Sequence, residues 1–268
     1  MDKKNLTEEI SYLVEEKKLA QVEQTTEQTF LSESAKAAEK CPIRSEKSLL
    51  TLITGGAAAG KTTFAKKVKE HLEQVQKKVL ILSLDWYYSY SPLLFQSRNP
   101  VLHQIFLWKE LNQDLETLLS GGSIYLPIYD DSEERRFTRS TILVESTPVI
   151  ILEGVLALFD EEVRKKSDLK IYLEVKEEVR LERRLERYKK GLAEGKFQKP
   201  IEYEIDRFYK GVPKKNQETY VEPTKQYSDL IIDNDNCEGN IEKVVEAINH
   251  QIEKINERAK QKLVRKTK

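Results

Sequence analysis

A glycine-rich segment follows directly after the apolar run Leu49–Thr54 and has the spacing G-x-x-x-x-G-K-T. Glycines let the backbone curl around a polyphosphate with its N–H groups pointing at the anion, and the start of the following helix adds a positive dipole end. The lysine supplies a point charge for the β- and γ-phosphates, and the next hydroxyl can ligate Mg²⁺. The pattern predicts a nucleoside triphosphate site made of Gly55, Gly56, Ala57, Ala58, Ala59, Gly60, Lys61, Thr62 and Thr63.

Two acids stand at the carboxyl ends of apolar runs, where ligands of open α/β sheets gather. Asp85 follows Val79–Leu84, and Glu153 follows Val149–Leu152. Phosphoryl transfer needs carboxylates that hold Mg²⁺ and a group that orients or deprotonates the acceptor. Either acid alone could merely begin a turn or cap a helix, but two of them beside a phosphate loop weaken that alternative. We assign Asp85 as acceptor-activating base and metal ligand, and Glu153 and Thr62 as further metal ligands.

Residues 176–190 form a predicted helix whose arginines recur three or four positions apart, so that most of them share one side. Guanidinium forks suit phosphate oxygens better than a lysine ammonium does. We therefore expect a lid over about 176–200 that closes on the phosphates and excludes water, which prevents futile ATP hydrolysis. A solvated helix face with Glu–Arg pairs is the alternative. The arginines are Arg180, Arg183, Arg184 and Arg187.

Short apolar runs alternate with helical patterns from residue 48 onward, which predicts an α/β fold of three layers with a mostly parallel sheet and helices on both faces. Two runs, Ile124–Ile128 and Thr141–Val144, predict an antiparallel excursion. A helix is expected over Val101–Ser120, ending at the following glycine pair. Further strands are expected at Leu169–Leu173 and Leu230–Asp233, and a last helix over 240–257.

Balanced charge excludes some classes of protein. The 268 residues include 45 Lys and Arg and 45 Asp and Glu, so the formal net charge is zero. This argues against a wholly basic nucleic-acid binder, and we expect no nucleic-acid partner. The longest apolar run, 149–159, is interrupted and shorter than the roughly 20 residues that span a bilayer. Cys41 and Cys237 lie far apart, and the start lacks the apolar stretch of a secretory signal. These features predict a cytoplasmic protein without a membrane partner.

Three parts of the chain differ in composition. Residues 1–47 predict one short amphipathic helix and a polar linker that buries too little apolar surface to offset its ordering entropy. Residues 48–257 form the phosphate-loop domain, including the lid. The tail 258–268 carries six Lys and Arg and no acid. We expect this tail to be a frayed, solvated terminus, with contact to an anionic surface as the alternative.

Several stretches together resemble the phosphoribulokinase/uridine kinase family of P-loop kinases. They cover roughly residues 48–235 at the expected spacing, and the Val-Glu-Pro-Thr-Lys-Gln-Tyr-Ser-Asp segment is more discriminating than the phosphate loop. The stretches are ITGGAAAGKTT (53–63), LSLDWYY (82–88), LPIYD (126–130), VIILEGVLAL (149–158), KIYLEVKEEVRLERRLER (170–187) and YVEPTKQYSDLII (220–232).

The resemblance implies a P-loop kinase fold, ATP as the phosphate donor, Mg²⁺ and a small-molecule acceptor. It is also compatible with a homo-oligomer, which members of this family often form. Its implied catalytic base is Asp85, with Lys61 and Arg183 stabilising the transferred charge. In the family's pattern, Arg180 and Arg184 close over the phosphates, while Tyr88, Tyr129 and, behind them, Arg136 belong to the acceptor pocket.

The acceptor half departs from the family pattern. Uridine kinases carry an acid that holds the ribose hydroxyls, but the nearest candidate segment, 96–100, has Arg98 there, and an ungapped count puts Val101 there instead. The histidine expected after Tyr129 is replaced, with Glu134 nearest. An arginine in place of the acid favours an anionic acceptor.

Three hypotheses follow. The first is an ATP- and Mg²⁺-dependent kinase that phosphorylates the 5′-hydroxyl of a pyrimidine nucleoside, uridine or cytidine. The second keeps the kinase but makes the acceptor a phosphorylated sugar or another small alcohol. The third is an ATP-binding regulatory or interaction protein, against which stands the joint presence of Lys61, Thr62, Asp85 and Glu153.

Overall fold

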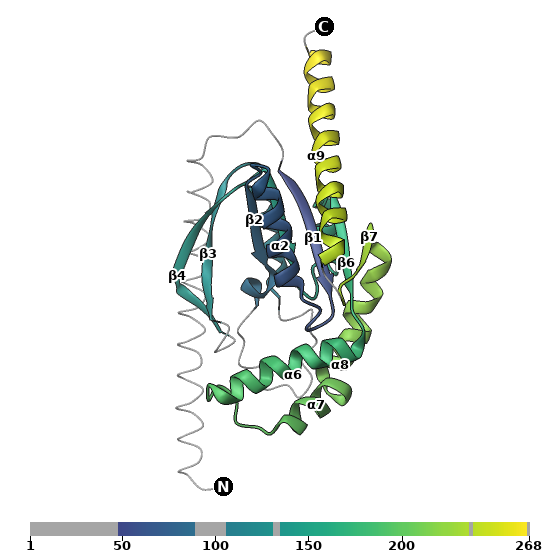
Figure 1. Ribbon diagram of the computed structural model, residues 1–268. Coiled ribbons are helices and arrows are strands. Elements are labelled where there is room, and N and C mark those ends of the chain that lie inside the picture. Colours follow the sequence, from purple (N-terminus) through teal and green to yellow (C-terminus); the bar gives the residue numbers. More distant parts are fainter. Residues whose placement is uncertain (1–47, 89–105, 131–134, 236–237, 267–268) are drawn as a thin grey trace.

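A computed structural model describes residues 48–88, 106–130, 135–235 and 238–266. Its centre is a five-stranded sheet in which every neighbouring pair of strands is parallel, in the order β2-β5-β1-β6-β7 (Figure 1). The strands are β1 (Leu49–Gly55), β2 (Val79–Ser83), β5 (Val149–Glu153), β6 (Leu169–Glu174) and β7 (Leu230–Asp233).

Helices cover both faces of this sheet. On one face, α2 (Lys61–Gln74) and α9 (Glu238–Lys266) bury an apolar stripe that includes Phe64 and Val244. On the other face, α4 (Trp108–Leu119) buries Leu111, Leu115 and Leu118 at helical spacing against the strands. A short helix, α5 (Glu161–Lys166), leads into β6. The expected three-layer α/β fold with a mostly parallel sheet is therefore confirmed.

A separate antiparallel hairpin stands beside the sheet. It consists of β3 (Ser123–Asp130) and β4 (Arg135–Glu145), with a register shift between Pro127 and Ile128. This is the antiparallel excursion that the sequence predicts.

Helices also lie beyond the carboxyl ends of the strands (Figure 1). The chain leaves β6 into α6 (Glu177–Ala193) and then forms α7 (Ile201–Lys210) and α8 (Val212–Asn216). It returns to β7 through a π-helical turn, η3 (Gln217–Val221), and a 3₁₀ segment, η4 (Glu222–Tyr227). The helix α6 lies within the segment 176–200 that is expected to form a lid, and α7 begins directly after that segment.

Three expected boundaries differ from the structure. The strand expected over Val79–Leu84 ends at Ser83, because the chain turns there into the 3₁₀ segment η1 (Leu84–Tyr87). The helix expected from Val101 begins at Trp108, since Phe106 instead pairs with Tyr88 in an isolated bridge. The last helix continues to Lys266, because no Gly or Pro interrupts the chain after position 239.

Some expectations fall outside the described residues. These are the N-terminal helix and linker over 1–47, the acceptor segment 96–100 with Arg98, Val101 and Glu134. Among the described helices, none combines the length and the apolar character that crossing a membrane requires.

Candidate active site

The phosphate loop closes tightly between β1 and α2. Gly60 caps α2 in a left-handed conformation with φ of 82°, which favours glycine. The backbone N–H of Ala59 donates to Gly56 O over 3.0 Å. The ammonium of Lys61 donates to the carbonyl oxygens of Gly55 at 3.2 Å and Gly56 at 3.0 Å. The loop is thus a curled backbone with a cation folded against its first residues.

Four charged side chains lie near enough to the Lys61 ammonium to influence its pKa. Burial is the largest effect on this group and lowers the pKa of Lys61 below its ordinary value. The carboxylates of Glu153 and Asp85 oppose that effect, whereas the guanidinium groups of Arg187 and Arg180 add to it. The structure therefore brings together the predicted lysine, both predicted acids and two lid arginines around one point.

The predicted metal ligands also lie together. The hydroxyl of Thr62 donates to Glu153 Oε1 over 3.1 Å, and Glu153 is 3% exposed. Residue 153 pairs with both Ile53 and Ser83, because β5 lies between β1 and β2. Asp85 follows on η1, where the hydroxyl of Ser83 accepts its backbone N–H.

These oxygens suit Mg²⁺ that arrives with a polyphosphate. Mg²⁺ is usually held by one or two carboxylates together with substrate phosphates and waters, rather than by an all-protein cage. The described residues contain no group of three or more His, Cys, Asp or Glu side chains that would hold a metal ion unaided. A hydroxyl and two carboxylates next to a phosphate loop fit that mode of binding.

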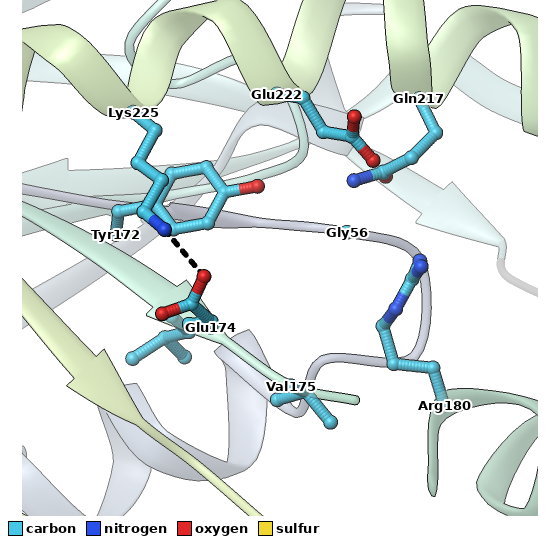
Figure 2. A pocket seen from close by; sticks show the side chains of 9 residues that line it. Gly56, Tyr172, Glu174, Val175, Arg180, Gln217, Glu222 and Lys225 are labelled. Atoms are coloured by element: carbon cyan, nitrogen blue, oxygen red, sulfur yellow. Dashed lines mark hydrogen bonds and ion pairs between the residues drawn. The ribbon is translucent and has the colours of Figure 1, made fainter. Parts of the chain in front are cut away.

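Arg180 is a buried cation with little internal compensation. It is 7% exposed, and the nearest carboxylate to it among the described residues is Glu177, 4.0 Å away. Its guanidinium points at Gly56 (Figure 2), where the position of an added Cβ would lie 2.5 Å from Arg180 Nη1. A desolvated charge is costly unless it is paired, so this arrangement favours an anionic ligand at the loop.

The other two arginines assigned to the phosphates lie differently. Arg183 donates from Nη2 to Asn234 O over 2.9 Å, and its Nη1 lies 3.7 Å from the position that a Cβ on Gly60 would take. Arg184 instead pairs through Nε with Glu204 on α7. Arg183 is therefore at the phosphate loop, whereas Arg184 joins the two lid helices.

The acceptor side is described in part. Tyr88 stacks on Phe106 with ring centroids 4.4 Å apart, and Phe106 in turn contacts Trp108 at 5.4 Å. Tyr129 and Arg136 are paired residues of the hairpin, but their side chains lie outside the described part of the structure.

Two residues at the loop were missed by the sequence reasoning. Asn234, 2% exposed, donates from Nδ2 to Ala59 O over 2.7 Å. It follows β7 directly, so its position at the end of a strand marks it in the same way as that of Asp85. Gln217 approaches Gly56 from η3, and no spacing or composition signal marks it.

Comparison with known proteins agrees with this geometry. Residues 50–239 match the model of the Phosphoribulokinase / Uridine kinase family. The uridine kinase of Halobacterium salinarum is 37% identical over 186 residues, which cover 67% of this chain and 77% of that protein. The uridine kinase of Lactobacillus helveticus is 32% identical over 191 residues, which cover 70% and 87%.

Solved structures share the fold. A protein described as a possible uridine kinase from Bacillus stearothermophilus superposes with a TM-score of 0.50 at 20% identity, over 71% of this chain and 91% of that one. The D-glycerate 3-kinase of Cryptococcus neoformans superposes with a TM-score of 0.50 at 16% identity, over 76% and 89%. With the family model and the sequence relatives, the conclusion is that the chain belongs to the phosphoribulokinase/uridine kinase family.

Proposed function

We propose that this protein transfers the γ-phosphate of ATP, with Mg²⁺, to the 5′-hydroxyl of a pyrimidine nucleoside, uridine or cytidine. The observation that carries the proposal is the half-buried Lys61 ammonium, which is folded against Gly56 with Asp85 and Glu153 near enough to shift its pKa. The nucleoside acceptor is inferred from two relatives that are named uridine kinases. The proposed compartment is the cytoplasm.

Each residue has a definite role in this reaction. Asp85 accepts the proton of the acceptor hydroxyl while the hydroxyl oxygen bonds to the γ-phosphorus and the bond to the β–γ bridging oxygen breaks, releasing ADP. The Lys61 ammonium, Arg180 and Arg183 stabilise the charge that spreads over the transferred phosphoryl group. Mg²⁺, held by Thr62, Glu153 and Asp85, would neutralise phosphate charge.

The lid supports transfer to the acceptor rather than to water. The lid helices α6 and α7 lie beyond the strand ends, and α6 brings Arg180 down to Gly56. A closed lid excludes water from the γ-phosphate, and this lowers the rate of ATP hydrolysis without an acceptor.

The acceptor alternatives have less support. A phosphorylated sugar is suggested by Arg98, which lies outside the described residues, and the relatives do not favour that acceptor. A regulatory ATP-binding protein would not need both the base and the metal carboxylates. A panel of uridine, cytidine and sugar phosphates, read by ADP release, separates these acceptors: a clear preference for uridine excludes the sugar phosphate, and the reverse preference overturns the nucleoside proposal.

The central test is Asp85→Asn. This change keeps the shape of the side chain but removes the base, so turnover should fall by at least about a hundredfold while ATP still binds. The matched control is Asp206→Asn on the exposed face of α7, where the same change affects only a surface ion pair with Lys210. Undiminished turnover in Asp85→Asn contradicts the assignment of the base.

A further inference from the structure

A polar cavity of about 260 Å³ opens beside the phosphate loop, on the side of β6. Figure 2 shows Tyr172 and Gln217 facing it, with the ion pair of Lys225 and Glu174 at another side. Arg180 and Gly56 both line this cavity. The roles proposed above for the active-site residues leave the cavity and its neutral polar side chains unexplained.

Gln217 approaches the same point of the loop as Arg180. Its Oε1 lies 2.9 Å from the position of a Cβ on Gly56, and Arg180 Nη1 lies 2.5 Å from that position. The amide oxygen and the guanidinium are therefore neighbours over one residue of the loop. Gln217 is 7% exposed and is the first residue of the π-helical turn η3, a distortion that is frequent at functional sites.

This part of the loop is the end that faces the terminal phosphates. The Lys61 ammonium, which in such loops reaches the β- and γ-phosphates, donates to Gly56 O over 3.0 Å. Arg180 and the Lys61 ammonium thus flank the same residue. A terminal phosphate there meets both cations.

Gln217 has a second polar neighbour on β6. Tyr172 is 5% exposed, and burial, followed by the charge of Glu222, raises the pKa of its hydroxyl above the ordinary value. Arg180 and a polar interaction with the Gln217 amide act in the opposite direction. The amide therefore lies near both a tyrosine hydroxyl and the guanidinium.

The neutrality of residue 217 matters for Arg180. A carboxylate at this place would pair with the guanidinium and so compete with a phosphate for it, whereas an apolar group would leave a desolvated cation without an acceptor nearby. An amide oxygen offers a dipole to the guanidinium and leaves its full charge for the ligand. We propose that Gln217 is a positioning residue, which holds Arg180 over Gly56 without neutralising it, so that Arg180 binds the terminal phosphate.

The proposal rests on the proposed ATP site and is tested without the acceptor. Calorimetric titration of the full chain with Mg·ATP and with Mg·ADP separates the terminal phosphate from the rest of the nucleotide. Gln217→Glu should weaken ATP binding by at least about tenfold and ADP binding by less than about threefold, because charge-assisted hydrogen bonds are the strong ones. Gln217→Met removes the amide. It should also weaken ATP binding more than ADP binding, but both changes should be smaller than in Gln217→Glu.

The matched control is Gln226→Glu, which adds the same charge at an exposed position of η4 and should alter neither affinity. Thermal unfolding shows whether each variant is folded; where Gln217→Glu is not, Gln217→Met decides. Equal weakening of ATP and ADP, or no weakening of either, overturns the positioning role. These titrations contain no acceptor, so their outcome does not depend on the nucleoside proposal. That proposal fails in a different experiment, if the unmodified protein does not turn over uridine or cytidine.

Discussion

The hydroxyl of Thr62 donates to the carboxylate of Glu153 over 3.1 Å, which joins the first turn of α2 to the end of β5. These two residues are 91 positions apart in the chain. They meet because β5 pairs with β1, the strand that leads into the phosphate loop. The sheet order therefore places the Glu153 carboxylate next to the loop hydroxyl.

Glu153→Gln removes the charge of this carboxylate. It keeps the contact with Thr62, because an amide oxygen still accepts that hydrogen bond. We expect a fall in kcat of about a hundredfold and an increase in the Mg²⁺ concentration needed for half-maximal rate. Initial rates over a Mg²⁺ series measure both. Glu161→Gln, on the exposed first turn of α5, is the control, and an unchanged Mg²⁺ dependence in Glu153→Gln argues against a metal role.

Gly56→Ala tests the close approach of the lid to the loop. An added Cβ would lie 2.5 Å from Arg180 Nη1 and 2.9 Å from Gln217 Oε1, so one of these side chains must move. We expect turnover to fall by at least about tenfold, as misplacement of a charged contact costs that much. Steady-state kinetics and thermal unfolding together separate loss of the contact from loss of the fold.

Gly195→Ala is the control for the Gly56→Ala experiment. Gly195 follows α6 with φ of 74°, and an added Cβ there has no atom within 4 Å. The cost is therefore backbone strain alone, about 1–2 kcal/mol of stability, with turnover near that of the unmodified protein. If Gly56→Ala merely lowers stability in the same way, the contact with Arg180 is not important for transfer.

The sequence predicts the parts of this site that depend on regular elements. The phosphate loop and its two acids follow from apolar runs that end in a particular residue type, and a parallel sheet brings such ends to one edge. The two-stranded hairpin follows from two short apolar runs around a polar loop. These features depend on local patterns, so one chain is enough to detect them.

The remaining parts depend on packing between elements that no local pattern specifies. One helix carries Arg180, Arg183 and Arg184. Arg184 turns away from the phosphate loop because it pairs with Glu204, a buried acid on α7. Gln217 approaches the loop from the π-helical turn η3, and the sequence does not predict such a turn. Helical spacing finds the arginines of the lid but not the partner of each one.

The pair of Arg184 and Glu204 should stabilise the lid only as a unit. Glu204 is 3% exposed, and its second oxygen, Oε2, has no hydrogen-bond partner among the described residues but lies 3.7 Å from Arg207 Nη1. Removing one member leaves a buried charge, so Glu204→Gln should lower the free energy of unfolding by roughly 3–5 kcal/mol. The double variant Arg184→Met/Glu204→Met should recover most of that loss, because two apolar side chains of similar volume bury no charge.

Urea unfolding of both single variants and the double variant measures the coupling energy. Titration of Arg184→Met with Mg·ATP adds a second readout, because a role for Arg184 at the phosphates predicts a weaker affinity. If the single and double variants lose stability additively, the pair does not act as a unit.

Lys61→Met should change the pH dependence of stability. Burial is the largest effect on the pKa of Lys61 and lowers it. The folded protein therefore releases this proton at a lower pH than the unfolded chain, in which lysines have a pKa of about 10.4. Between these two pKa values the unfolded chain binds more protons, and this lysine makes the free energy of unfolding rise with pH. Methionine removes that contribution. The stability of Lys61→Met relative to the unmodified protein should therefore fall as the pH rises toward the unfolded pKa of about 10.4.

Urea unfolding at several pH values measures this difference, with Lys66→Met at an exposed position of α2 correcting for the general loss of one lysine. ATP titrations at the same pH values should show a matching effect on affinity, because only the protonated amine attracts phosphate. The ATP affinity of the unmodified protein should fall as Lys61 loses its proton. Lys61→Met should lack that part of the pH dependence. If the stability of Lys61→Met instead rises with pH relative to the unmodified protein, the pKa of Lys61 is not lowered. That result would mean that Glu153 and Asp85, rather than burial, dominate the environment of the ammonium.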